Sequence, residues 1–237
     1  MLSKRLQSLT KYINKNDKLI DIGCDHALLD IYLIKNDIVS NMIVSDIHEN
    51  ALNQGITNIK HYQLSDKIET RLGNGLNVLN DNDDINTILI SGMGSNTILD
   101  IIDNKYFDRI EKLVIQSNND HELLRRGIIS KGYIIDQEEY LIDKNKEYIN
   151  IVFIKGNKKY TNIELKYGPI LLHNKEYINS LVKTKRQIIN YIPKNKMLLR
   201  FKMNREIKKL NSYIKRLWLA FICLLYYNLI VIWNLTG

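Results

Sequence analysis

The sequence predicts an α/β protein, in which a sheet of parallel strands is closed by an antiparallel hairpin and followed by a helical appendage. Apolar runs alternate with helical patterns over residues 1–156, which is typical of a parallel sheet covered on both faces. Only a short polar turn separates the last two runs, so they are expected to pair antiparallel. The expected strands are Lys18–Ile22, Met42–Ser45, Ile68–Leu72, Thr87–Ser91, Leu113–Gln116, Tyr133–Tyr140 and Tyr148–Ile154.

The turn after the first expected strand contains Asp21, Gly23, Asp25 and His26. A glycine there lets a ligand approach the backbone, and the turn leaves N–H groups free to donate. This single glycine departs from the three-glycine fingerprint of dinucleotide sites. A glycine flanked by acids better suits a nucleoside with a cationic amino-acid tail, and S-adenosylmethionine is such a ligand. The alternative is that Asp25 and His26 cap the next helix and only shape the pocket.

Asp46 and Ile47 follow the second expected strand. Ligands of doubly wound sheets lie beyond the carboxyl ends of the strands. Asp46 stands near the offset at which an acid reaches a ribose diol, and a carboxylate accepts from two hydroxyls at once. The alternative is a surface acid or a cap on the helix expected over Glu49–Ile59. Its position favours the ribose role.

The turns after the third, fourth and fifth expected strands are rich in glycine and amide side chains. Glycines permit close approach to a ligand, and an amide offers both donors and acceptors to a nucleobase edge. An Asn-Gly pair is also a common plain turn. The residues are Asn74 and Gly75 after the third strand, Gly92 and Met93 after the fourth, and Gln116 and Asn118 after the fifth.

Composition limits the compartment and the partners. The net charge of +8 favours a polyanionic partner, although a coding bias toward lysine is an equal alternative. The two cysteines, Cys24 and Cys223, indicate no disulfide framework, and the amino terminus does not read as a secretory signal, so a cytoplasmic protein is expected. The histidines lack ligand spacing, so no metal site is expected.

Three stretches are expected: a cofactor-binding domain over residues 1–156, a basic helical domain over 157–216, and a hydrophobic tail over 217–237. Pro193 should break the helical domain into two pieces. A solvated helical pair, charged only for solubility, is the alternative to a binding surface. The tail carries no charge and is long enough to span a membrane as a helix. A membrane anchor is the minority hypothesis, beside a packed helix and an aberrant end.

These segments together resemble the bacterial tRNA (adenine-N1)-methyltransferases that modify adenine 22 in the D-arm. The combination of residues 21–26 with Gly92-Met93-Gly94 is the specific part, and the resemblance covers about residues 2–216. The chain departs from the family pattern at Ser95, where glycine is usual, at Ser117, where proline is usual, and at Asn74, where aspartate is frequent. The resemblance implies a Rossmann-like class I methyltransferase fold, S-adenosylmethionine as cofactor and tRNA as partner.

The resemblance also implies roles for individual residues. Methyl transfer to a ring nitrogen needs alignment and desolvation more than a strong base. Asp25 is the candidate for electrostatic stabilisation of the cationic product, and His26, Gln116 and Asn118 are candidates for orienting the base. The basic residues expected to bind tRNA phosphates are Lys4, Arg5, Lys183, Lys185, Arg186, Lys194, Lys196, Arg200, Lys202 and Arg205.

Two other functions fit the same cofactor pattern. A class I methyltransferase acting on a small molecule or a protein would share the pocket, although it would not need a basic appendage. A binding module that kept the pocket but lost catalysis is the second, and Ser95 and Ser117 are the features that favour it. A monomer or a weak dimer is expected.

Overall fold

The computed structural model describes residues 2–236, without the side chains of 217–236. The chain divides into two compact units, the first ending at Lys166 and the second beginning at Tyr167.

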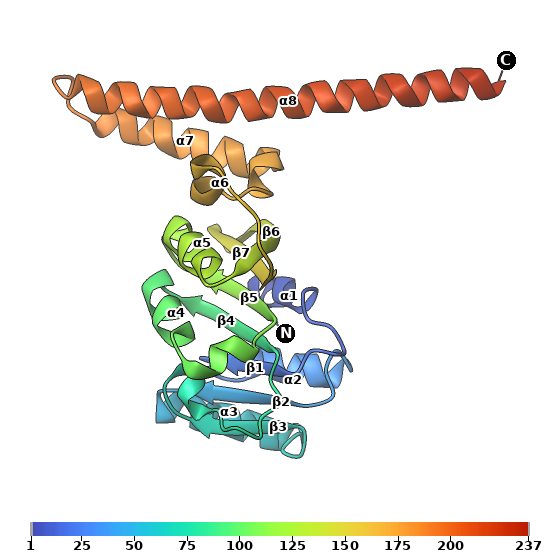
Figure 1. Cartoon of the computed structure of the whole chain (residues 1–237), viewed down its shortest axis with the longest axis vertical. Coiled ribbons are helices and arrows are strands. Elements are labelled where there is room, and N and C mark those ends of the chain that lie inside the picture. Colours follow the sequence, from blue (N-terminus) through green and yellow to red (C-terminus); the bar gives the residue numbers. More distant parts are fainter. Residues whose placement is uncertain (1, 237) are drawn as a thin grey trace. The chain divides into compact units, whose positions relative to one another are not determined.

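The first unit is built on a seven-stranded sheet with the order β3-β2-β1-β4-β5-β7-β6 (Figure 1). The first five strands along the chain pair in parallel, and β7 pairs antiparallel with both β5 and β6. The predicted sheet and hairpin are therefore confirmed. The strands are β1 (Leu19–Ile22), β2 (Met42–Asp46), β3 (Ile68–Leu72), β4 (Thr87–Met93), β5 (Lys112–Ser117), β6 (Tyr133–Asp143) and β7 (Lys146–Lys155).

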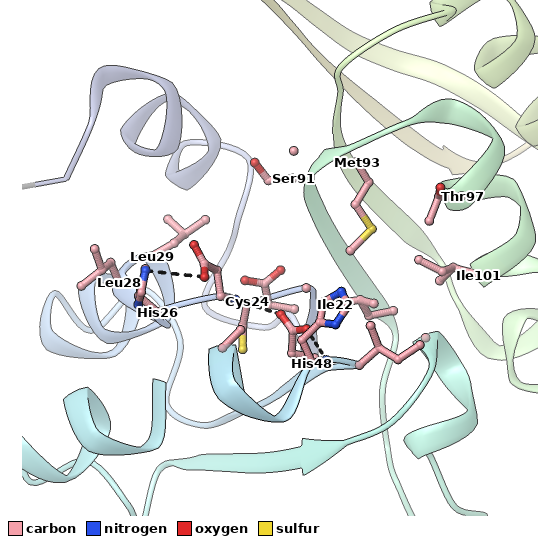
Figure 2. A pocket seen from close by; sticks show the side chains of 18 of the residues that line it. Ile22, Cys24, His26, Leu28, Leu29, His48, Ser91, Met93, Thr97 and Ile101 are labelled. Carbon is pink, nitrogen blue, oxygen red and sulfur yellow. Dashed lines mark hydrogen bonds and ion pairs between the residues drawn. The ribbon is translucent and has the colours of Figure 1, made fainter. Parts of the chain in front are cut away.

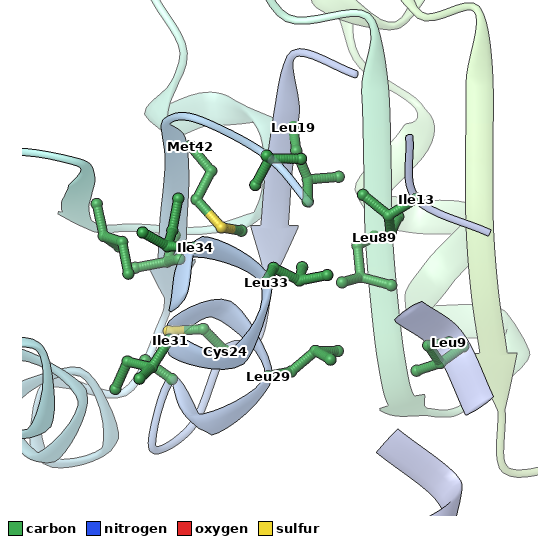
Figure 3. Close-up of a cluster of buried hydrophobic side chains, with 14 of the residues drawn as sticks. Leu9, Ile13, Leu19, Cys24, Leu29, Ile31, Leu33, Ile34, Met42 and Leu89 are labelled. Atoms are coloured by element: carbon green, nitrogen blue, oxygen red, sulfur yellow. The ribbon is translucent and has the colours of Figure 1, made fainter. Parts of the chain in front are cut away.

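Helices cover both faces of this sheet (Figure 1). One face packs against α1, α2 and α3, where Leu9, Leu33 and Ile59 join Leu19 and Leu89 of the strands in one buried cluster (Figure 3). Burial of such a side chain stabilises the fold by about 1.5–3 kcal/mol. The helices of the unit are α1 (Lys4–Thr10), α2 (Leu28–Lys35), α3 (Glu49–His61), α4 (Ser95–Ile102), α5 (His121–Ser130) and α6 (Asn162–Tyr167), with short 3-10 helices at Gly75–Val78 and Lys105–Arg109.

The hairpin of β6 and β7 is longer than the sequence predicts. Its two turn residues, Lys144 and Asn145, have φ of 48° and 62°. Two successive residues in the left-handed region give a turn whose twist matches that of the flanking strands. Pairing therefore continues to Asp143 and Lys146, at the edge of the turn itself.

The boundary between the units falls later than the expected boundary after Gly156. The intervening segment is fastened to the first unit by hydrogen bonds. The backbone N–H of Ile135 donates to the Tyr160 hydroxyl at 2.8 Å, and Arg125 donates to the carbonyls of Leu165 and Lys166 at 3.2 and 3.3 Å. Composition alone does not reveal such contacts.

The second unit contains the 3-10 helix Leu171–His173 and the two long helices α7 (Lys175–Tyr191) and α8 (Met197–Thr236). Pro193 lies between α7 and α8, as predicted, because a proline interrupts helical hydrogen bonding. The two helices run side by side as a hairpin (Figure 1). Over the part of the chain that the structure describes, no helix is both long and apolar enough to cross a membrane. The hypotheses for the tail at 217–237 concern side chains outside that part.

Candidate cofactor pocket

Most of the predicted catalytic and cofactor-binding residues line one pocket at the carboxyl ends of β1, β2 and β4. This pocket has a volume of about 570 Å³. Met93, Thr97 and Ile101 line one side and His26 and Leu28 another (Figure 2). Its size is that of an ordinary small-molecule site. The predicted cofactor residues that line it are Asp21, Gly23, Asp25, Asp46, Ile47, Asn74, Gly75, Gly92 and Met93.

The turn between β1 and α2 has unusual backbone geometry. Gly23, Asp25 and Ala27 have φ of 80°, 51° and 54°. The left-handed region costs a residue with a side chain about 1–2 kcal/mol, and such strain gathers at ligand sites. A Cβ atom on Gly23 would clash with the Met93 side chain. The Met93 side chain therefore lies directly against the Gly23 backbone in the wall of the pocket.

Asp46 ends β2 and is buried. Its Oδ2 accepts from the N–H of Asp25 at 3.3 Å, and its Oδ1 accepts from the N–H of His48 at 2.8 Å. The N-cap residue of α3 is His48, so the alternative of Asp46 as the cap of that helix is wrong. Asp46 instead joins the turns after β1 and β2 and presents a carboxylate to the pocket.

Asp25 and His26 lie at the rim of the pocket. The Nε2 of His26 is 3.6 Å from the Oδ1 of Asp25, and their side chains are 53% and 70% exposed, respectively. The N-cap of α2 is Ala27, without a side-chain hydrogen bond. The capping alternative for Asp25 and His26 is therefore wrong, and both side chains face the pocket opening.

Two buried acids lie at the closed end of the pocket region. Asp21 of β1 is 5% exposed and lines the pocket. Asp30 of α2 is fully buried. Burial, together with the neighbouring carboxyls of Asp30 and Asp46, raises the pKa of Asp21 well above its usual range. Burial raises the pKa of Asp30 to about 7. Sequence reasoning missed Asp30, although an aspartate inside an apolar helical run was a visible signal.

Arg5 lies in the pocket, where sequence reasoning had assigned it to tRNA phosphates. Its guanidinium donates from Nη1 to the Ser91 hydroxyl at 2.9 Å and to the Gln116 side-chain oxygen at 2.6 Å. The Gln116 amide nitrogen donates to the Ser117 carbonyl at 2.9 Å and to Oδ1 of Asn118 at 3.3 Å. Gln116 is fully buried and engaged on both sides, so its geometry suits positioning of the loop better than contact with a base.

Two of the departures from the family pattern, Ser95 and Ser117, lie against each other. The hydroxyls of Ser95 and Ser117 are 2.9 Å apart, so that one can donate to the other, and the Asn119 carbonyl accepts from the hydroxyl that is left, with distances of 2.6 Å to Ser95 and 2.9 Å to Ser117. Asn118 is tied to the same place, because its amide donates to the Gly92 carbonyl at 2.6 Å. The loops after β4 and β5 are thereby joined beside the pocket.

The second unit presents most of its predicted RNA-binding cations to solvent. Lys185 is the first exception, because it pairs with Glu206 at 2.7 Å and is 15% exposed. Arg200 is the second, because it donates to the carbonyls of Ile189 and Ile192 at the end of α7. Lys4 of the first unit donates to the Ile142 carbonyl and is exposed. The exposed cations of the hairpin are Lys183, Arg186, Lys194, Lys196, Lys202 and Arg205.

Other pocket residues also escaped sequence reasoning. His48, Thr97 and Ile101 line the pocket. His48 comes two positions after Asp46, and Thr97 and Ile101 lie one helical turn apart in α4, a spacing that places both on one helix face. Over the described residues, no cluster of histidine, cysteine, aspartate and glutamate is arranged to hold a metal ion.

A glycine turn after the first strand, an acid after the second and a sheet of this order define a class I, S-adenosylmethionine-dependent methyltransferase. A family model described as "Methyltransferase domain" matches residues 2–151. The tRNA (adenine(22)-N(1))-methyltransferase of Bacillus subtilis is 29% identical over 175 residues, which are 72% of this chain and 73% of that protein.

Solved structures agree with this match. The structure of M. capricolum TrmK with the cofactor product S-adenosyl-homocysteine is 31% identical, covers 91% of this chain and 98% of its own, and superposes with a TM-score of 0.79. A protein of the NADB-Rossmann superfamily from Streptococcus agalactiae is 32% identical, with coverage of 90% and 97% and a TM-score of 0.81. The chain belongs to the tRNA (adenine(22)-N(1))-methyltransferase family.

Proposed function

We propose that this protein transfers a methyl group from S-adenosylmethionine to the N1 ring nitrogen of adenine 22 in tRNA. The observation that carries the proposal is the pocket at the carboxyl ends of β1, β2 and β4, in which Asp21, Asp46 and the turn at Gly23 lie together. The relatives named for this reaction extend over most of the chain. The exposed cations of the hairpin favour a polyanionic substrate such as tRNA.

The residues of the pocket fit the cofactor. Gly23 lines the cavity without a side chain of its own, and the buried carboxyls of Asp21 and Asp46 would meet the polar groups of the ligand there. Asp46 would accept from the ribose hydroxyls, Asp21 would face the ammonium group, and Asn74 would offer its amide to the adenine edge. When bound, the cofactor supplies a sulfonium methyl as the electrophile.

The chain itself needs to align the target base and exclude water. The N1 atom of adenine has its own lone pair, so no residue has to remove a proton to create the nucleophile. Asp25 lies at the pocket rim, where a carboxylate would stabilise positive charge as it develops on the base. Asn118, fixed through its bonds to Gly92 and Gln116, would orient the base. His26 is the further orienting candidate, paired with Asp25.

The hairpin is proposed to hold the tRNA body. Adenine 22 lies within folded tRNA, so access to it costs a few kcal/mol of unstacking, on the order of what several phosphate contacts return. Six exposed cations on α7, α8 and their connection would make such contacts. Lys185 and Arg200 would instead keep the two helices together.

Methyl transfer to an unmodified tRNA transcript tests the proposal. The purified chain is incubated with transcript and labelled S-adenosylmethionine, and the methyl group is mapped. We expect label at N1 of adenine 22, and no label in a matched transcript in which guanine replaces that adenine.

Other outcomes separate the alternatives. Label at another tRNA position, or only in a protein or small molecule, would contradict the proposed substrate. Cofactor binding without transfer to any transcript would identify a binding module. Asp46→Asn provides the control for a contaminating enzyme, because label from this chain should fall with cofactor affinity.

A further inference from the structure

Asp30 carries a carboxyl group that the methyl transfer does not use. It lies in the first turn of α2, among apolar neighbours, and its side chain has no exposed surface. Neither carboxyl oxygen receives a hydrogen bond from a donor group among the described residues. An ionised carboxylate in that position is costly, because burial removes its hydration and no hydrogen-bond donor takes the place of the lost water.

The groups that face Asp30 are acidic or neutral. Asp21 of β1 lies within hydrogen-bonding reach, Asp46 of β2 adds negative charge, and Cys24 of the intervening turn is a buried thiol whose pKa is raised by burial and by these acids. Among the described residues, no cationic side chain is a cause of the raised pKa values of Asp21 and Asp30. The guanidinium of Arg5 lines the same cavity, but it is bonded to Ser91 and Gln116. Two adjacent buried carboxyls without a cation are stable with one proton between them, since that proton makes one group a donor to the other.

Asp21 connects this pair to the pocket. It lines the cavity, whereas Asp30 lies behind it and is not part of the lining. A positive group that enters the cavity against Asp21 therefore meets the pair from its accessible side. It supplies the counter-charge that the pair lacks in the free protein.

We propose that Asp21 and Asp30 share one proton in the free protein and release it when a ligand ammonium group binds at Asp21. Asp30 is thus a positioning residue. The proton that it shares makes Asp21 respond to the cationic tail of a ligand and not to a nucleoside alone. The inference rests on the proposed function, because it takes the cavity to be the cofactor pocket.

The balance of this step is simple. The ammonium group of the ligand places one positive charge against Asp21, the pair goes from one negative charge to two, and the proton leaves to the buffer. The bound ammonium lowers the pKa of the pair, so release occurs between the bound and free pKa values. Within that window, affinity rises with pH by about tenfold per unit for one proton released. Below the window both states hold the proton, and above it neither does.

Calorimetry on the unaltered protein gives the first test. S-adenosyl-homocysteine is titrated at pH 7 into the protein in phosphate and in Tris, whose ionisation enthalpies differ, and the difference in observed heat gives the protons released. We expect about 0.5–1 proton per ligand. 5′-Methylthioadenosine, which has the nucleoside but no ammonium group, should release none. Zero release with S-adenosyl-homocysteine, or equal release with both ligands, would overturn the proposal.

A pair of matched variants gives the second test. Asp30→Asn keeps the shape and gives Asp21 a permanent donor, so proton release and the rise of affinity with pH should both disappear. Asp37→Asn makes the same chemical change at an exposed position just after α2, and it should behave as the unaltered protein. Release that persists in Asp30→Asn would contradict the proposal. If that variant does not fold, the comparison of the two ligands decides.

The result separates this inference from the proposed function. Absence of S-adenosyl-homocysteine binding in any buffer would count against the proposed function itself. Binding with normal affinity and no proton release would overturn only the role of the Asp21–Asp30 pair.

Discussion

The pocket of the first unit keeps its acids buried, whereas the hairpin of the second unit keeps most of its predicted RNA-binding cations in solvent. Asp21, Asp30 and Asp46 are all less than a tenth exposed, and charges buried in this way interact in a medium that screens them weakly. Six cations of the hairpin are exposed, where salt screens them. The difference teaches that the two kinds of charge suit two proposed tasks: short-range selection of a small ligand in the first unit, and long-range, salt-dependent attraction of tRNA by the second.

Neutralising the hairpin cations should have the largest effect. Replacing Lys183, Arg186, Lys194, Lys196, Lys202 and Arg205 by glutamine should weaken tRNA binding about 10²–10³-fold at moderate salt, because phosphate contacts release counterions. The slope of log affinity against log salt should flatten by several units. Affinity for S-adenosyl-homocysteine should be unchanged. Filter binding at several salt concentrations measures the first two quantities and calorimetry the third.

A variant that keeps the charge is the control for this set. Changing the four lysines among these positions to arginine should leave tRNA affinity within about threefold, since phosphates accept from either side chain. An unaltered salt slope in the glutamine variant would show that the hairpin does not hold the tRNA.

The next largest effect is expected at Asp46. Asp46→Asn removes a charged acceptor that joins two turns, so cofactor affinity should fall about 10- to 100-fold. The affinity for tRNA should remain. Calorimetry with S-adenosyl-homocysteine gives the ratio of the two affinities. Asp66→Asn is the matched control, because Asp66 is exposed and lies just before β3, at the opposite end of that strand from the pocket. Equal affinity in both variants would exclude Asp46 from the cofactor site.

A smaller effect concerns stability and pH at Asp30. Its pKa is about 7 in the folded protein and about 3.9 in an unfolded chain, so it stabilises the fold fully below pH 4 and loses that contribution as pH rises to 7. Asp30→Asn, which does not titrate, should therefore gain about 1–3 kcal/mol relative to the unaltered protein between pH 5 and pH 8. Urea unfolding at both pH values measures the difference. A constant difference would mean that Asp30 does not titrate in this range.

The smallest effect is expected for the serine pair beside the pocket. Ser95→Ala and Ser117→Ala should each reduce unfolding free energy, and a double-mutant cycle should give a coupling of about 0.5–1.5 kcal/mol. The cycle of Ser95→Ala with Ser130→Ala is the control, because among the described residues the Ser130 hydroxyl bonds to the nearby Gly127 carbonyl alone. The effects of these two substitutions should be additive. Additivity in both cycles would show that the hydroxyl contact contributes no coupling.

Much of the site was predictable, because the carboxyl ends of parallel strands converge on one edge of a sheet. That rule placed Gly23, Asp46, Asn74 and Gly92 together from their positions after apolar runs, and the pocket lining agrees. It could not place Arg5, which precedes the first strand and reaches the pocket from α1. Its bonds to Ser91 and Gln116 depend on how α1 packs on the sheet.

The sequence by itself determined the order of strands and helices, the break at Pro193 and the turns that form the cofactor site, since these follow from local periodicity, glycine and proline. Only the tertiary structure decided which charges are buried and what they meet. It put Asp30 behind Asp21, Lys185 against Glu206 and Ser95 against Ser117. The reason is physical: burial and pairing arise between segments distant in the chain, and local pattern does not encode those distances.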